Sequence, residues 1–255
     1  MPSINYGELG ARLPLEAVLF DLFDTLVLVE DEKAFYTPSL KSLYNFLVKN
    51  GINPPFNDFS RVYFEVRDKF YSESRKTLEE PHFNVRVAQT LGRLGYNMDA
   101  SDEIVNGATL AFADEFMHYV RLDEDAPYVL QKLHEKYKLG VVSNFAIPEC
   151  CWKLLEKFGL KAFLDTVIIS GEVNRRKPSP EIFEKALKAL NVTASRAVFI
   201  GDMPSLDVEG PKNVGMKTVL IRRKTAKETV NVKPDCTIKS LRELLVALQD
   251  LLIPE

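Results

Sequence analysis

The chain has 255 residues, of which 46% are hydrophobic and 27% charged, a composition typical of a folded globular protein. Its 33 Lys and Arg and 36 Asp and Glu residues give a net charge of −3, so it lacks the basic excess that nucleic acid binding requires. Its apolar runs fall short of the roughly 18 residues that a membrane span needs. Three cysteines fit no disulfide framework, and the N-terminal residues do not have the pattern of a secretory signal. We therefore expect a cytoplasmic protein that binds neither nucleic acid nor membrane.

Short apolar runs along the chain are typical of strands buried on both faces of a parallel sheet. Helical periodicity fills the gaps between the last four of them. In chain order the predicted strands are Ala17–Leu22, Leu139–Ser143, Thr166–Ser170, Ala197–Gly201 and Lys217–Ile221. The predicted helices of this part are Ala126–Lys136, Pro148–Phe158, Pro180–Leu190, Leu206–Val214 and Leu241–Leu252. Strands that alternate with helices predict right-handed crossovers and an α/β fold with a doubly wound parallel sheet.

More than a hundred residues separate the first predicted strand from the second. This stretch favours helices only, with Gly and Pro at the breaks between them. The predicted helices are Pro38–Lys49, Phe56–Glu73, Asn84–Leu94 and Asp102–Val120. We expect residues 33–118 to form an inserted all-helical cap over the carboxyl edge of the sheet, where ligands of open α/β sheets bind. Residues 1–32 and 119–255 would form a Rossmann-like core.

Acidic side chains follow two of the predicted strands. Asp21 comes after the first strand, and Asp202 comes after the fourth with Asp207 behind it. If these strands are neighbours, about 5 Å apart, Asp21 and Asp202 converge. Carboxylates that close repel each other unless a divalent cation lies between them, and Mg²⁺ prefers such oxygen ligands. Taken singly, Asp21 could instead cap a turn and Asp207 a helix.

Two further polar segments lie at positions from which they could complete an anion site. Ser143 and Asn144 close the second predicted strand, where a hydroxyl, an amide and backbone N–H groups could hold an anion or simply form a turn. Lys177 precedes a predicted helix and could neutralise Asp21 and a bound phosphate, or belong to a solvated basic loop.

In their order and spacing these segments resemble the four motifs of the haloacid dehalogenase superfamily. They read DLFDT at 21–25, SN at 143–144, KPSP at 177–180 and GDMPSLD at 201–207. The resemblance covers the whole chain, including a helical cap inserted after the first motif. It implies a Rossmann-like core and a phosphatase-like hydrolase that acts on a small-molecule phosphate ester with Mg²⁺ as cofactor. Such a protein would be a monomer or a homodimer.

The resemblance also implies catalytic roles for matching positions. Asp21 would be the nucleophile that forms a covalent aspartyl intermediate, and Thr25 would fix the loop that carries it. Ser143 and Asn144 would bind the transferred group. Lys177 would orient Asp21, contact the substrate and offset negative charge.

The implied metal site uses acidic side chains of two motifs. Asp21 and Asp202 would hold Mg²⁺, with Asp207 behind them. The backbone carbonyl of Phe23 would be a further ligand, and a carbonyl does not depend on the side chain that follows it.

The first motif departs from the pattern of the superfamily's phosphatases. These enzymes carry a second Asp two residues after the nucleophile, where this sequence has Phe23. That Asp acts as general acid and base, which is typically worth about 10²–10⁴ in rate. Asp24 comes one residue later, and adjacent side chains of an extended segment point to opposite sides. A turn that brings Asp24 inward would be needed for it to replace the missing acid.

Two alternatives therefore stay open. A 2-haloacid dehalogenase needs no acid because halide leaves without a proton. The resemblance implies that such enzymes usually lack the acidic fourth motif, which is intact here. It also implies an arginine shortly after the first motif to receive the halide, and no Arg lies between Asp21 and Arg61. A catalytically weak, phosphate-binding protein of the same superfamily is the other alternative.

Residues of the predicted cap would select the substrate. The candidates are Arg86, together with Tyr36, His82 and Asn84, near breaks that could face the sheet edge. Arg75 and Lys76 are expected to be a solvated pair, and Tyr63, Phe64, Phe70 and Phe83 are expected to form the core of the cap.

Overall fold

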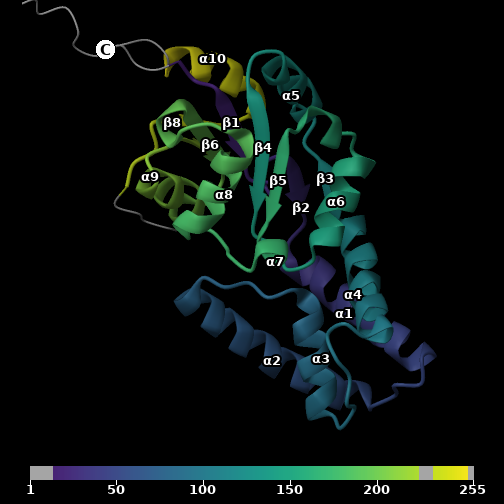
Figure 1. Cartoon of the computed structure of the whole chain (residues 1–255). Coiled ribbons are helices and arrows are strands. Elements are labelled where there is room, and N and C mark those ends of the chain that lie inside the picture. The colour runs from purple at the N-terminus through teal and green to yellow at the C-terminus, as the bar shows by residue number, and fades with distance from the viewer. Residues whose placement is uncertain (1–13, 224–231, 252–255) are drawn as a thin grey trace, which may run out of the picture.

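The computed structural model describes residues 14–223 and 232–251. Over these ranges, six strands form one sheet in the order β5-β4-β1-β6-β7-β8, and every neighbouring pair is parallel (Figure 1). The strands are β1 (Ala17–Phe20), β4 (Lys138–Ser143), β5 (Thr166–Ile169), β6 (Ala197–Gly201), β7 (Lys217–Ile221) and β8 (Cys236–Ile238). The predicted parallel α/β sheet is confirmed, and β1 lies inside it between β4 and β6.

Helices cover both faces of this sheet because successive strand side chains point to opposite faces. Val18 and Phe20 of β1 belong to one apolar cluster, and Ala17 and Leu19 belong to another that includes Phe183 of α8. The core helices are α5 (Ala126–His134), α6 (Pro148–Lys157), α7 (Ser170–Val173), α8 (Pro180–Leu190), α9 (Gly210–Asn213) and α10 (Leu244–Asp250). No helix in the described part of the chain has the length and apolar character needed to cross a membrane.

A helical insert lies between strands β2 (Val27–Val29) and β3 (Val120–Leu122), which pair antiparallel. Its helices are α1 (Glu32–Lys49), α2 (Phe56–Thr77), α3 (Phe83–Arg93) and α4 (Glu103–Phe116). In Figure 1 the α2–α3 pair lies beyond the end of the sheet from which α7 emerges, which is the carboxyl end of β5. The predicted helical cap is therefore present, whereas its boundaries at 33 and 118 stay a prediction.

Several helix boundaries differ from those that the sequence predicts. Helix α1 begins at Glu32, six residues before Pro38, because the side chain of Asp31 accepts a hydrogen bond from Lys33 N and caps it. Helix α4 ends at Phe116, since Val120 pairs with Val29 in the small sheet. The segment predicted as one helix from Leu206 forms a π-helix over Pro204–Glu209 followed by α9. Leu252, the predicted end of the last helix, lies outside the described residues.

Candidate active site

The carboxyl ends of β1 and β6 bring the predicted acidic residues together. The two strands pair in register, with Phe20 opposite Ile200, so Asp21 and Asp202 leave the sheet side by side. One carboxylate oxygen each from Asp21, Asp202 and Asp207 lie within 4.8 Å of one another. Asp207 is fully buried and Asp21 is nearly so. Three acidic groups are thus concentrated at one point of the sheet edge.

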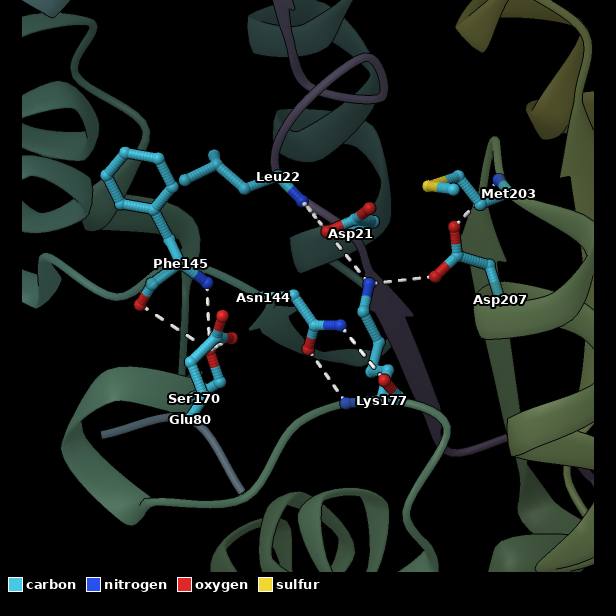
Figure 2. Close-up of polar contacts among 9 residues, drawn as sticks. All are labelled: Asp21, Leu22, Glu80, Asn144, Phe145, Ser170, Lys177, Met203 and Asp207. Atoms are coloured by element: carbon cyan, nitrogen blue, oxygen red, sulfur yellow. Dashed lines mark hydrogen bonds and ion pairs between the residues drawn. The ribbon is translucent and has the colours of Figure 1, made fainter. Parts of the chain in front are cut away.

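Lys177 lies between two of these carboxylates (Figure 2). Its Nζ is 2.9 Å from Asp21 Oδ1 and 2.8 Å from Asp207 Oδ1, and its side chain is 1% exposed. Burial alone would lower the pKa of this lysine, but the attraction of Asp207 and Asp21 outweighs it and raises the pKa. Lys177 is therefore a buried, charged ammonium that neutralises part of the acidic cluster.

Asn144 fixes the backbone of Lys177. Its Oδ1 accepts a hydrogen bond from Lys177 N at 2.8 Å, and its Nδ2 donates to Lys177 O at 3.0 Å. Both polar ends of the amide are thus engaged in positioning the lysine (Figure 2). The predicted role of Asn144 in binding the transferred group stays a prediction, and the observed contacts add a positioning role.

The loop after β6 holds Asp207 against the sheet. Asp207 Oδ2 accepts a hydrogen bond from Met203 N at 2.9 Å. A Cβ added at Gly201 would collide with the Asp207 carboxyl group, so this close approach requires glycine at the end of the strand. The absence of a side chain at Gly201 therefore makes room for the carboxyl group of Asp207.

The charge balance of the cluster fits a divalent cation. Burial raises the pKa of Asp21 to about 7, with Lys177 opposing the rise and Asp207 adding to it. Burial, followed by repulsion from Asp21 and Asp207, raises the pKa of Asp202 to about 8. One ammonium does not neutralise three carboxylates, and carboxylate oxygens are the ligands that Mg²⁺ prefers. Asp21, Asp202 and Asp207, with the predicted carbonyl of Phe23, are the residues that would hold the ion.

Two buried hydroxyl groups, at the carboxyl end of β4 and in the loop after β1, lack a hydrogen-bond partner among the described residues. Ser143, at the end of β4, and Thr25, in the loop after β1, are both 0% exposed. Neither Oγ atom forms a hydrogen bond among the described residues. Buried hydroxyl groups are nearly always satisfied, so the Ser143 hydroxyl is available for a ligand oxygen. Thr25 is held through its backbone, since its carbonyl accepts a hydrogen bond from Arg223 Nη2 at 3.0 Å.

The side chains of Phe23 and Asp24 have different surroundings. The ring of Phe23 packs against Phe145, 4.8 Å between centroids, and Phe116 of α4, 5.8 Å away. Asp24 has a left-handed backbone, with φ of 51°, and its Oδ1 accepts a hydrogen bond from Val29 N at 3.2 Å. The carboxylate of Asp24 is thus hydrogen-bonded to β2, and the ring of Phe23 packs between the cap and the core.

We expect Asp24 to stabilise the conformation of its loop rather than to act as a catalytic acid. Asp24→Ala should destabilise the protein by about 1–2 kcal/mol more than Asp24→Gly, because alanine tolerates a left-handed backbone poorly. Urea unfolding of both variants measures this difference. Both should keep most of the hydrolytic activity of the wild type, and loss of activity in both would identify Asp24 as the acid after all.

A cavity of about 810 Å³ lies between the cap and the loops that follow β4 and β6. Tyr36 and Arg86 line it, as does Arg75, which is exposed. His82 instead joins the cap to α6, with Nε2 3.1 Å from Glu149 Oε2. Asn84 donates from Nδ2 to Ala100 O at 3.0 Å.

One polar group at this cavity has no recognisable signal in the sequence. Glu80 lies 3.6 Å from Arg176 Nη1 and accepts a hydrogen bond from Ser170 Oγ, while Ser170 Oγ accepts one from Phe145 N at 2.8 Å (Figure 2). Glu80 and Ser170 are 90 positions apart and belong to no motif. Only the packing of the cap on the core brings them together.

The comparison with known families decides the classification. A family model described as haloacid dehalogenase-like hydrolase matches residues 63–221. The chain belongs to the haloacid dehalogenase-like hydrolase family. The resemblance carried by the four motifs is therefore confirmed.

Relatives of this hydrolase include phosphatases. The glyceraldehyde 3-phosphate phosphatase of Pyrococcus abyssi is 32% identical over 208 residues, which cover 80% of each chain. That of Methanopyrus kandleri is 29% identical over 245 residues, covering 93% of this chain and 98% of the relative. A solved phosphatase of the family from Thermococcus onnurineus has a TM-score of 0.62 and 28% identity, covering 92% of this chain and 98% of its own. A 2-haloacid dehalogenase from Pseudomonas syringae, with a TM-score of 0.72 and 21% identity over 93% of this chain and 99% of its own, shows the fold alone.

Proposed function

We propose that this hydrolase is a Mg²⁺-dependent phosphatase that acts on a small phosphate ester through an aspartyl-phosphate at Asp21. The observation that carries the proposal is the convergence of Asp21, Asp202 and Asp207 around the buried ammonium of Lys177. The phosphatases among the relatives support it. A dehalogenase has no need of the Asp202–Asp207 pair, so the acidic cluster favours phosphate chemistry.

The proposed reaction has two steps. A carboxylate oxygen of Asp21 forms a bond to phosphorus while the bond from phosphorus to the ester oxygen breaks, and the leaving oxygen takes a proton from solvent to depart as the alcohol. The oxygen of a water molecule then bonds to phosphorus and loses a proton to solvent, while the bond from phosphorus to Asp21 breaks, which frees the carboxylate and releases inorganic phosphate. Lys177 holds Asp21 in place, and the Ser143 hydroxyl donates to a phosphoryl oxygen. Bound Mg²⁺ would offset the negative charge that accumulates between the carboxylates and the phosphoryl oxygens.

The direct test is hydrolysis of p-nitrophenyl phosphate with and without Mg²⁺. Nitrophenolate leaves without a proton, so the aromatic residue at position 23 matters least for this substrate. We expect Mg²⁺ to raise both turnover and the melting temperature of the wild type. Asp202→Asn should remove most of the melting shift and lower turnover about 10²-fold, since it removes one carboxylate of the cluster.

Two outcomes would contradict this assignment. An unchanged Mg²⁺ response in Asp202→Asn would remove that residue from the metal site. Mg²⁺-dependent phosphate binding without turnover would instead favour a binding protein, and halide release from a short 2-haloacid would favour dehalogenation.

Phe23→Asp is expected to improve turnover of substrates with poor leaving groups. The new carboxyl group would stand at the position from which phosphatases of this superfamily protonate the leaving oxygen. The gain should be about 10-fold for glycerol phosphate and small for p-nitrophenyl phosphate, because only the alkoxide needs a proton. Phe23→Asn, of matched size without the acid, is the control. An equal gain in both variants would attribute the effect to lost packing on Phe145 and Phe116.

A further inference from the structure

The cavity beside the proposed catalytic centre is large and aromatic. Its volume of about 810 Å³ is in the upper part of the range for sites that hold drug-sized ligands. All four cap helices contribute rings to its lining, including Tyr36, Tyr71, Phe83 and Phe112, and Phe145 contributes from the core. Such walls favour a ligand with a substantial apolar body over a short, fully polar one.

A buried cation lines the same cavity. Arg86 of α3 is 7% exposed, and no described residue forms a hydrogen bond with its Nε. Its guanidinium lies over the rings of Phe83, at 4.8 Å, and Tyr71, at 5.2 Å. Among the described residues, no carboxylate forms an ion pair with it. Ring faces stabilise a cation only partly, and a charge this deeply buried normally has an anionic partner.

The neighbouring tyrosines do not supply that partner. The hydroxyl oxygens of Tyr63 and Tyr36 lie 3.1 Å apart, and both tyrosines interact with Arg86, Tyr63 through a hydrogen bond as well. Burial raises the pKa of both phenols above its ordinary value, so both are neutral. Arg176, another arginine of the cavity, is instead paired with Glu80. Arg86 thus holds a positive charge at the cavity that no carboxylate among the described residues offsets.

We propose that the substrate carries a second anionic group, on the far side of an apolar body from its phosphate ester, and that Arg86 binds that group. This inference rests on the proposed phosphatase function and names the class of its substrate. The anion is a carboxylate or a second phosphate, both of which fit the planar fork of a guanidinium. Arg86 contacts no reacting atom, so its contribution is to binding.

The test compares matched aryl phosphates on the wild type and on Arg86→Met. The probes are 4-carboxyphenyl phosphate and 4′-carboxybiphenyl-4-yl phosphate, each beside its uncharged carboxamide, with 1,4-phenylene bisphosphate beside phenyl phosphate. We expect the wild type to prefer the anionic member of at least one pair by about 10- to 100-fold in kcat/KM, mainly through KM. The preferred pair identifies the anion as carboxylate or phosphate. Arg86→Met should lose this preference, so that its kcat/KM on the anionic member falls to about that on the uncharged member.

Arg67→Met is the matched control. Arg67 also lies over the rings of Tyr36 and Phe64, but it is paired with Asp68 and does not line the cavity. This variant should keep the full preference. If Arg86→Met does not fold, Arg86→Lys replaces it, and a preference reduced by the loss of the guanidinium fork supports the proposal.

The two proposals fail in different ways. Hydrolysis of every probe with no preference for an anionic member overturns the role of Arg86 and leaves the phosphatase function standing. Absence of any hydrolysis overturns the phosphatase function, and calorimetric titration of the same pairs then decides the role of Arg86. Tighter binding of the anionic member, lost in Arg86→Met, supports it, and equal binding overturns it.

Discussion

Replacing Asp21 with asparagine is expected to lower Mg²⁺-dependent turnover of p-nitrophenyl phosphate by about 10⁴-fold or more. The amide of asparagine is a far weaker nucleophile than a carboxylate, so no covalent intermediate forms. Its oxygen can still accept the hydrogen bonds that Leu22 N and Lys177 donate to Asp21 Oδ1. The geometry of the site should therefore survive. Steady-state kinetics of purified wild type and variant measure the effect.

Stability provides the control for this experiment. Burial raises the pKa of Asp21, so its ionised form costs free energy in the folded state. Asp21→Asn should therefore have a melting temperature no lower than that of the wild type. Asp24→Asn, a change of the same kind in the same loop, should keep its activity. Turnover that persists in Asp21→Asn would remove covalent catalysis by this residue.

Lys177→Met is expected to destabilise the protein by about 3–5 kcal/mol, the usual cost of leaving a buried ion pair without one partner. The change leaves the fully buried Asp207 and the nearly buried Asp21 without their shared cation. Because the pKa of Lys177 is raised, its contribution is fully present below pH 10.5 and is lost only as the pH rises through the raised value. Urea unfolding at pH 7 measures the loss.

Lys212→Met is the matched control for Lys177→Met. Lys212 also pairs with an aspartate, Asp235, at 3.2 Å, but both side chains are about one third exposed. Solvent screens such pairs, and the expected loss is about 0–1 kcal/mol. Equal losses in the two variants would show that Lys177 is not the group that offsets the buried carboxylates.

The main strands and the acidic cluster could be predicted because their signals are local. A strand buried on both faces is apolar along nearly its whole length, and β1, β4, β5, β6 and β7 come close to this pattern. Strand β8, with its partly exposed Cys236, and the short strands β2 and β3 have no comparable pattern. Their positions depend on pairing with distant segments, which a single sequence does not reveal.

The lining of the cavity between the cap and the core was harder to predict for the same reason. Arg86 could be proposed as a binding residue from its place near a helix start. The sequence could not reveal that it has no carboxylate partner in the described structure. The pairing of Glu80 with Arg176 joins positions 96 residues apart and depends on how the cap packs on the core. Arg75 is exposed, as its charged stretch of sequence predicts, but its place at the cavity could not be read from that stretch.

The pairing of β2 with β3 has an evolutionary consequence. Val29 pairs with Val120, and Glu30 N donates to Tyr119 O at 3.1 Å, so the cap departs from the core and returns to it at one place. An insertion whose ends already touch can grow, shrink or be exchanged without moving the strands that carry Asp21 and Asp202. Selection on this fold can therefore change what the protein recognises through helices α1–α4 while the reaction chemistry of the sheet edge is inherited unchanged.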